Sequence, residues 1–232
     1  MKIDHQKFIH LGINFVTSPR PILTQQKMLE FQQAIINNGL EFSRVEQNPE
    51  VMNIIRDSIS PLTIRVISPN QPLGQIIVIS EFPKIPLNLF IEEACAAIEA
   101  FNNVWGSEKR QVLGGDTTLR ELIETTSQHA FQELWEMRLE QSAKTLAIFE
   151  RPVRGGGLRF VLDPIPDDIQ SSQLEVKIES YLKDTTKIYV EVQSRWQASR
   201  PQSDFDVKNR LDEVQTFLGE KVHNFLSGAN ND

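Results

Sequence analysis

The chain has 232 residues and a formal net charge of −7; 40% of its residues are apolar and 24% are charged. These proportions are ordinary for globular proteins, so they argue against general disorder and allow one large domain or two small ones. Both halves of the chain carry more acidic than basic residues, so the basic surface that drives nucleic-acid binding is not expected.

The single cysteine, Cys95, excludes an internal disulfide framework and fits a reducing compartment. The first residues, Met1 to Lys7, contain an acid and no apolar core, so they do not resemble a secretory signal. No stretch approaches the roughly 18 consecutive apolar residues of a membrane-spanning helix. By elimination, we expect a cytoplasmic protein without a membrane partner.

The first half of the chain predicts a mixture of strands and helices. Apolar and polar residues alternate from Phe8 to Val16, which is typical of a strand with one buried face. Met28, Phe31 and Ile35 form the apolar stripe of a helix, and Gly39 suits its C-terminal cap. The expected elements are a strand at 8–16, a helix at 24–38, a short strand at 40–46, a brief helix at 48–57, a hairpin of strands at 62–68 and 75–82, and a helix at 88–105.

The second half predicts two further hairpins between helices. Thr118 and Glu121 have the spacing of a capping box, in which each side chain bonds the other's backbone N–H, so they predict the start of a long helix. Apolar residues from Val207 to Phe225 recur at three- and four-residue steps, which predicts an amphipathic last helix. The expected elements are a helix at 118–140, a hairpin of strands at 145–149 and 158–162 joined through 154–157, a polar loop at 163–172, a hairpin of strands at 174–181 and 187–196, and a helix that begins near 204 or 206 and ends at 226.

Two of these hairpins resemble each other, and each leads into a long helix. Leu62–Ser68 matches Leu174–Ser180 in pattern, and the second strands begin at the same offset, at Gln75 and Lys187. The match predicts an internal duplication with two related lobes around a shared cleft; alternatively, any hairpin followed by a helix gives this pattern. The predicted fold class is α+β, with antiparallel sheets packed against long amphipathic helices. The predicted lobes are residues 1–107 and 108–226, followed by a disordered tail at 227–232.

A segment rich in arginine and glycine is the most unusual part of the sequence. Glycine amides can approach an anion without a side chain in the way, and the planar guanidinium of arginine suits phosphate or carboxylate. The alternative is a hairpin loop with solvated charges, because no helix N-terminus follows and the spacing fits neither a P-loop nor a dinucleotide-binding motif. The residues that would bind an anion or a nucleotide are Arg151, Arg154, Gly155, Gly156, Gly157 and Arg159.

The last helix and one tryptophan are candidates for contact with another chain. Trp196 lies near Arg195 and Arg200, and aromatic and arginine residues are enriched at interfaces. The alternative for the apolar stripe of the last helix is packing onto the protein's own sheet. The candidate interface residues are Trp196, Leu211, Leu218 and Phe225.

The sequence contains no recognised catalytic motif and no metal-ligand spacing. The histidines, His5, His10, His129 and His223, lie on different predicted elements, and Cys95 between two alanines has the surroundings of a small core residue. We therefore assign no catalytic residue, no metal site and no cofactor. Whether the protein is an enzyme stays open, because the fold could assemble a site from distant residues.

The segment from Gly157 to Ile165, Gly-Leu-Arg-Phe-Val-Leu-Asp-Pro-Ile, resembles a Gly-Leu-Arg-Tyr-Ile-Asn signature. That signature belongs to a sporadically distributed family of uncharacterised bacterial proteins of similar size. The opening strand, the prolines after it and the closing helix are also similar to this family, whereas Phe160 and Leu162 depart from its Tyr and Asn. The resemblance implies a two-lobed α+β protein and brings no known activity, substrate or catalytic residue.

Three hypotheses for the function follow from these patterns. The first is a non-enzymatic module that binds a protein through sheet edges or the last helix, either an unknown partner or a second copy in a homodimer. The second is a small-anion or nucleotide-binding protein that uses the segment at 151–159. The third is an enzyme whose site the fold assembles.

Overall fold

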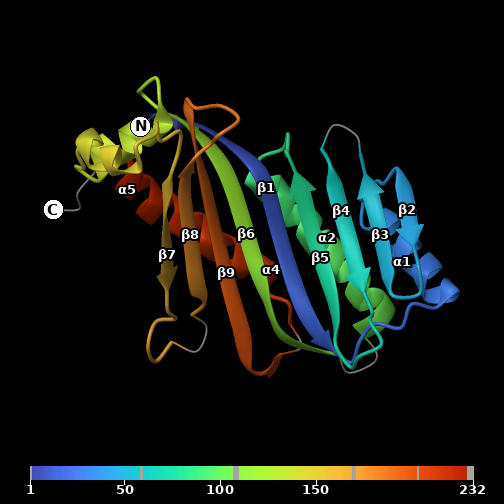
Figure 1. The fold of residues 1–232 in the computed structure, drawn as a ribbon. Coiled ribbons are helices and arrows are strands. Elements are labelled where there is room, and N and C mark those ends of the chain that lie inside the picture. Colours follow the sequence, from blue (N-terminus) through green and yellow to red (C-terminus); the bar gives the residue numbers. More distant parts are fainter. Residues whose placement is uncertain (1, 58–59, 107–109, 169–170, 203, 229–232) are drawn as a thin grey trace.

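The strands that the structure describes form a nine-stranded sheet in which every neighbouring pair is antiparallel (Figure 1). The computed structural model describes residues 2–57, 60–106, 110–168, 171–202 and 204–228. The strand order is β2-β3-β4-β5-β1-β6-β9-β8-β7. The predicted α+β class with an antiparallel sheet is therefore confirmed.

The elements have the following bounds. The strands are β1 (Lys2–Ser18), β2 (Arg44–Gln47), β3 (Val51–Arg56), β4 (Leu62–Ile67), β5 (Gly74–Glu81), β6 (Gln111–Glu124), β7 (Gly157–Leu162), β8 (Gln173–Ser180) and β9 (Lys187–Gln202). The helical segments are α1 (Gln25–Asn37), α2 (Leu87–Trp105), α3 (Ala130–Gln132), the π-helical η2 (Glu133–Arg138), the 3₁₀ helix η3 (Ala143–Phe149), α4 (Val207–Phe217), the π-helical η4 (Leu218–Val222) and α5 (His223–Ser227).

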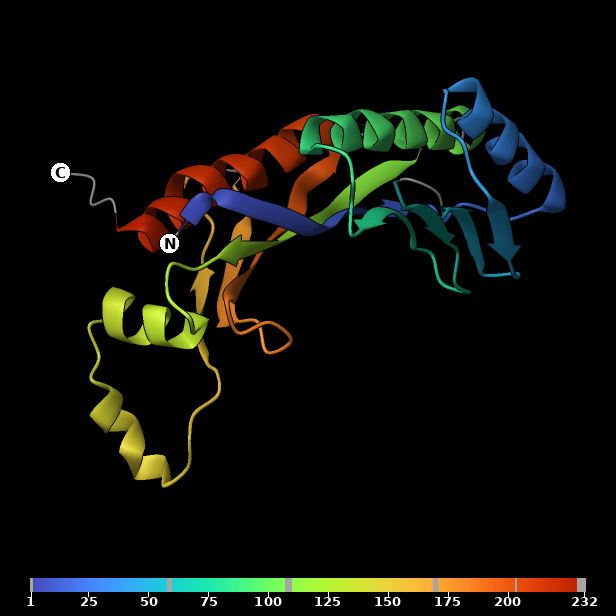
Figure 2. The same ribbon diagram turned by 90° about the horizontal axis from the view of Figure 1, so that it is seen from above.

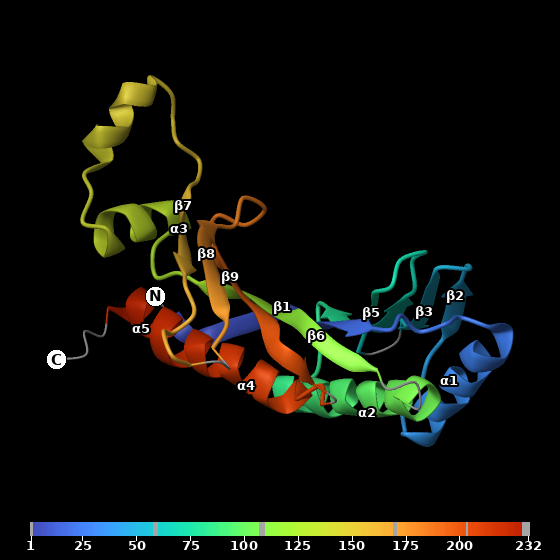
Figure 3. The ribbon, with the colours of Figure 1, turned by 90° about the horizontal axis from the view of Figure 1, so that it is seen from below.

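The helices of the described part of the chain cover one face of the sheet and leave the other uncovered. Figures 2 and 3 show α2, α4 and α5 in a layer along one face, and both ends of the sheet bend away from this layer. The segment from α3 to η3 extends away from the sheet on the opposite side, as an arm. The sheet therefore has a helix face and an open, concave face.

The core lies between the sheet and the helix layer, as the alternation of apolar residues along the strands predicts. In β4, for example, Leu62, Ile64 and Val66 are buried while the residues between them are half-buried. An aromatic cluster joins α1 to α2, because the ring of Phe31 lies 6.5 Å from that of Phe101 and 5.2 Å from that of Trp105. Burial of these rings supplies a large share of the hydrophobic stabilisation.

Most predicted elements of the first half are confirmed. The strand at 8–16 lies within β1, the hairpin is formed by β4 and β5, and the helix at 88–105 is α2. The helix α1 has Thr24 as its N-cap, which accepts a hydrogen bond from the Lys27 amide. Gly39 follows its C-cap with a φ of 80°, a conformation that glycine adopts without strain. In the second half, the hairpin of β8 and β9 and the start of the last helix after Asp206 are also confirmed.

The helix predicted at 118–140 is wrong in its first part, because residues up to Glu124 form the strand β6; only Ala130–Arg138 of the predicted range is helical. Thr118 and Glu121 lie on opposite faces of that strand, which is inserted between β1 and β9. Glu121 is fully buried on the helix face and its Oε1 lies 2.6 Å from His223 Nε2 of α5. Tertiary pairing therefore outweighs the local capping pattern.

Three shorter predictions also differ from the structure. The brief helix predicted at 48–57 is wrong: residues 48–50 form the turn after β2, and Val51–Arg56 is the strand β3. In the turn, the Asn48 side chain accepts hydrogen bonds from the amides of Glu50 and Val51. The short strand at 40–46 is limited to β2. The hairpin of 145–149 with 158–162 does not form, because η3 is helical and β7 pairs with β8.

The sheet runs continuously across the boundary predicted between 107 and 108. That boundary lies outside the described residues, but β1 from the first segment pairs with β6 from the second along most of its length. Of the tail predicted at 227–232, Ser227 ends α5 and Gly228 caps it with a φ of 76°. Residues 229–232 lie outside the described part of the chain.

The buried contact between Glu121 and His223 predicts a large stability effect. We expect His223→Ala to lower the free energy of unfolding by about 3–5 kcal/mol, because it leaves the Glu121 carboxylate buried without its partner. The control is His5→Ala, because His5 and Glu124 are both exposed, and we expect it to cost about 1 kcal/mol or less. Urea unfolding at pH 7 measures the free energy of unfolding of both variants. Equal losses in the two variants would contradict a stabilising role for the buried contact between Glu121 and His223.

Candidate interaction site

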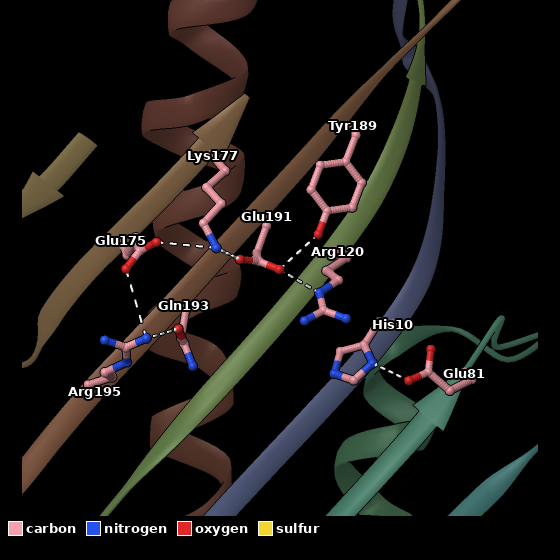
Figure 4. A network of polar contacts seen from close by, with 9 residues as sticks. All are labelled: His10, Glu81, Arg120, Glu175, Lys177, Tyr189, Glu191, Gln193 and Arg195. Carbon is pink, nitrogen blue, oxygen red and sulfur yellow. Dashed lines mark hydrogen bonds and ion pairs between the residues drawn. The ribbon is translucent and has the colours of Figure 1, made fainter. Parts of the chain in front are cut away.

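A row of charged residues crosses the open face of the sheet and ends on β7. Successive strand pairings place one residue from each of six strands side by side, and Figure 4 shows those on β5, β1, β6, β9 and β8. From β5 to β7 these residues are Glu81, His10, Arg120, Glu191, Lys177 and Arg159. We call them the charged row.

Glu191 is the centre of the charged row. It accepts hydrogen bonds from Lys177 Nζ and Arg120 Nε, each at 2.6 Å, and from the Tyr189 hydroxyl at 2.8 Å. Lys177 also lies 3.2 Å from Glu175, whose Oε1 is 2.9 Å from Arg159 Nε. Both carboxylates are buried, so each is compensated by cations from neighbouring strands.

The ionisation of these groups reflects their mutual contacts. Burial by itself would raise the pKa of Glu191, but the hydrogen bonds from Lys177, Tyr189 and Arg120 outweigh it and lower this pKa to about 2. The ion pair with Arg159 is the main cause that lowers the pKa of Glu175. The hydrogen bond to Glu191 raises the pKa of Lys177. Glu191, Glu175 and Lys177 are therefore charged near neutral pH, and their contacts hold these side chains in place.

The outer side of β7 has backbone groups that face away from the sheet. The amide of Ser180 donates to the carbonyl of Gly156 at 3.0 Å, which fixes the alternation of hydrogen-bonded pairs between β7 and β8. The even-numbered residues of β7 consequently bond β8, and the N–H and C=O groups of Gly157, Arg159 and Val161 point outward. Among the described residues, no strand pairs with this side of β7.

The other edge strand, β2, differs from β7 in ways that protect it. β2 has four residues, and Arg44 forms ion pairs with Glu46 and Asp57. Short length and charged side chains are features that block the addition of another strand. β7 is longer and has a single charged residue, Arg159; Phe160, Val161 and Leu162 are 41%, 56% and 37% exposed. β7 is therefore the unprotected edge of the sheet.

An apolar groove lies on the helix face beside β7. It has a volume of about 500 Å³ and lies between β7 and the segment from α4 to α5. The rings of Phe160 and Phe225 meet edge-to-face at 5.8 Å, and both side chains are 41% exposed. Lys221 also lines the groove. The free edge thus lies between the end of the charged row on one face and apolar side chains on the other.

The segment predicted to bind an anion is only partly available for that role. The amide of Gly156 donates to the Ser180 hydroxyl at 3.0 Å, and Arg159 pairs with Glu175. Arg151 and Arg154 are exposed. None of the three glycines has a positive φ. The structure therefore brings Gly157 and Arg159 to the edge strand and leaves the two other arginines in the preceding loop.

Close packing explains why glycine occupies positions 155 to 157. A Cβ atom at Gly155 would lie 2.5 Å from the Ser180 hydroxyl, and one at Gly156 would lie 2.6 Å from the ring of Phe131. A Cβ atom at Gly157 would lie 2.4 Å from the carbonyl oxygen of Ile178. The absence of a side chain permits these approaches.

The four candidate interface residues have different environments. Trp196, Leu211 and Leu218 are 6%, 0% and 2% exposed within the chain's own core, so their side chains are not available to a partner, and this part of the prediction is wrong. The stripe of the last helix packs on the sheet, which was the alternative. Phe225 is exposed in the groove beside β7. Cys95, expected in the core, is exposed.

The part of the chain that the structure describes contains no group of three or more His, Cys, Asp or Glu residues placed to hold a metal ion. None of its helices combines the length and the apolar character needed to span a bilayer. The chain matches no protein-family model and no curated protein.

The low pKa of Glu191 predicts a specific loss of stability in acid. A carboxyl group with a lower pKa in the folded state stabilises the fold above its unfolded-state pKa of about 4.5, and this contribution is lost as the pH falls toward 2. We expect a loss of up to about 3 kcal/mol over this range. The Glu191→Gln variant should lack this loss of unfolding free energy in acid. The control variant Glu99→Gln, at an exposed position on α2, should show the same loss as the unchanged protein. Urea unfolding from pH 6 to pH 2.5 measures the slope, and identical slopes for both variants would contradict the role of Glu191.

The packing at Gly157 predicts that alanine is not tolerated there. Gly157→Ala should lower the free energy of unfolding by about 1–3 kcal/mol, because the new methyl group meets backbone atoms of β8. Gly219→Ala is the matched control: a Cβ atom there meets nothing within 4 Å, and helical alanine should be neutral or stabilise by up to about 1 kcal/mol. Chemical unfolding distinguishes the two; a neutral Gly157→Ala would contradict the packing.

Proposed function

We propose that the protein is a non-enzymatic interaction module that receives a strand of its partner on the free edge of β7. The observation that carries this proposal is the outward backbone of Gly157, Arg159 and Val161 beside exposed apolar side chains. Addition of a strand to an exposed sheet edge is a recurring mode of protein recognition. Main-chain hydrogen bonds provide affinity, and the side chains on the two faces provide specificity.

We also infer that the chain consists of two related halves, which gives a reason for the free edge. Outward from β1 the order is β5, β4, β3, and outward from β6 it is β9, β8, β7. Each series is followed by helix on the same face, α2 in one half and α4 to α5 in the other. In this correspondence β7 matches β3, and β2 covers the outer edge of β3. The position that matches β2 beside β7 holds no strand among the described residues, so it is the place for a partner's strand.

The surroundings of β7 support a protein partner more than a small anion. The free edge combines apolar side chains, hydrogen-bonding backbone groups and the basic Arg159, the mixture typical of protein interfaces. The charged row behind it is fixed by its internal ion pairs, so less side-chain entropy is lost on binding. In the segment at 151–159, by contrast, the Gly156 amide already has a partner.

Site-specific photo-crosslinking tests the proposed edge. A photoreactive phenylalanine analogue at position 161 should crosslink to a protein in cells that produce the chain, because the side chain lies next to the added strand. The same analogue in place of Val45 on β2 should give few adducts, because that edge is protected. Adducts at both positions to the same extent, or at neither, would contradict the proposal.

A further inference from the structure

We propose that the strand added to β7 is β7 of a second copy, paired antiparallel about a twofold axis. In this pairing Val161 lies opposite the partner subunit's Val161, and two sheets join into one. The inference rests on the proposed function, because it names the partner of the same edge. It follows from the self-complementary sequence Arg159-Phe-Val-Leu-Asp163.

The backbone of β7 restricts the registers that such a pair can adopt. Residues whose N–H and C=O groups face the partner must lie directly opposite one another in an antiparallel pair. In β7 these are the odd-numbered residues, because the even-numbered ones bond β8. Pairing about Val161 satisfies this condition. In the single chain Asp163 directly follows the last residue of β7 and lines a hollow beside α4. The pairing would extend β7 by this one residue and so place Arg159 opposite the partner subunit's Asp163.

The side chains match on both faces in this register. On the open face, Arg159 meets the acidic Asp163 of the partner subunit, and the twofold axis repeats the ion pair. The Arg159 side chain is 63% exposed and contacts Glu175 through Nε, and a guanidinium carries four further N–H donors. On the helix face, Phe160 lies opposite the partner subunit's Leu162. Opposite charges and apolar pairs in these positions stabilise antiparallel strands.

Neighbouring registers match less well. When the partner's strand is moved to the next allowed register, Arg159 lies opposite Val161 of the partner subunit and has no acid to pair with. In the register after that, Arg159 lies opposite Arg159 of the partner subunit, where like charges repel. A shift in the other direction places Val161 opposite the partner subunit's Asp163 and also leaves Arg159 without an acid. Pairing about Val161 combines two ion pairs with two apolar pairs, and this favours it over these neighbouring registers.

The groove beside β7 gives the pairing an apolar component. Phe160, Leu162 and Phe225 are each more than a third exposed in the single chain. The twofold axis brings the partner subunit's Phe160 and Leu162 next to the same side chains, so the two apolar surfaces cover one another. Burial of exposed apolar surface is the main favourable contribution in such contacts.

Charge reversal tests both the dimer and its register. Sedimentation equilibrium should find the full-length protein as a dimer. Asp163→Arg and Arg159→Glu should each weaken the dimer roughly 100-fold, because each places two like-charged pairs across the axis. An equimolar mixture of the two variants should restore a dimer that contains one chain of each, since both ion pairs are then opposite in charge. Val161→Pro should also give monomers, because it removes an outward amide while leaving the bonds to β8.

Two controls and two contrary results complete the test. Arg154→Glu and Glu99→Arg reverse exposed charges away from the edge and should remain dimeric, and thermal unfolding confirms that each variant is folded. Dimers that survive Asp163→Arg, Arg159→Glu and Val161→Pro would overturn the inference. A monomeric native chain that still crosslinks through position 161 to a different protein would overturn the second copy as partner and leave the proposed function standing. A monomer without such crosslinks would overturn both.

Discussion

Each backbone N–H and C=O group in a strand requires a hydrogen-bond partner, and a sheet that does not close into a barrel leaves two strands with an unpaired side. This constraint shapes the protein more than any single side chain. In the described part of the chain, seven strands have neighbours on both sides, and β2 and β7 have a neighbour on one side only. β2 is four residues long and carries ion pairs, whereas β7 exposes Phe160, Val161 and Leu162. The difference between the two edges is the basis of the proposed function.

The one-sided helix layer imposes a second requirement, because the open face must satisfy its own charges. Contacts between neighbouring strands satisfy these charges. Glu191 accepts hydrogen bonds from Lys177, Arg120 and Tyr189, and Glu175 links the same network to Arg159. A network whose members are all bonded is rigid, and its cost of desolvation is already met in the folded chain. Arg159 is therefore held at the edge where a partner's acidic side chain would lie. The same network accounts for the low pKa of Glu191.

Patterns with a local cause could be read from the sequence, whereas those set by distant pairing could not. The alternation in β1, the glycine after helix α1 at position 39 and the stripe of α4 follow from neighbouring residues, and they were predicted. Thr118 and Glu121 suit a helix cap equally well, and only the position of β6 between two strands makes them part of a strand. The strand at 158–162 was expected, but its partner was not. Arg159 was among the predicted site residues. The charged row to which it belongs could not be predicted, because it depends on the register in which six strands pair.

The most direct test is amide hydrogen exchange of β7 by NMR in the full-length protein. The amides of Phe160 and Leu162 bond β8 and should exchange slowly in every case, so they serve as internal controls. If another strand occupies the edge, the amides of Arg159 and Val161 should be protected to a similar degree, and this protection should decrease on dilution. Slow exchange at 160 and 162 together with fast exchange at 159 and 161 at all concentrations would contradict the account.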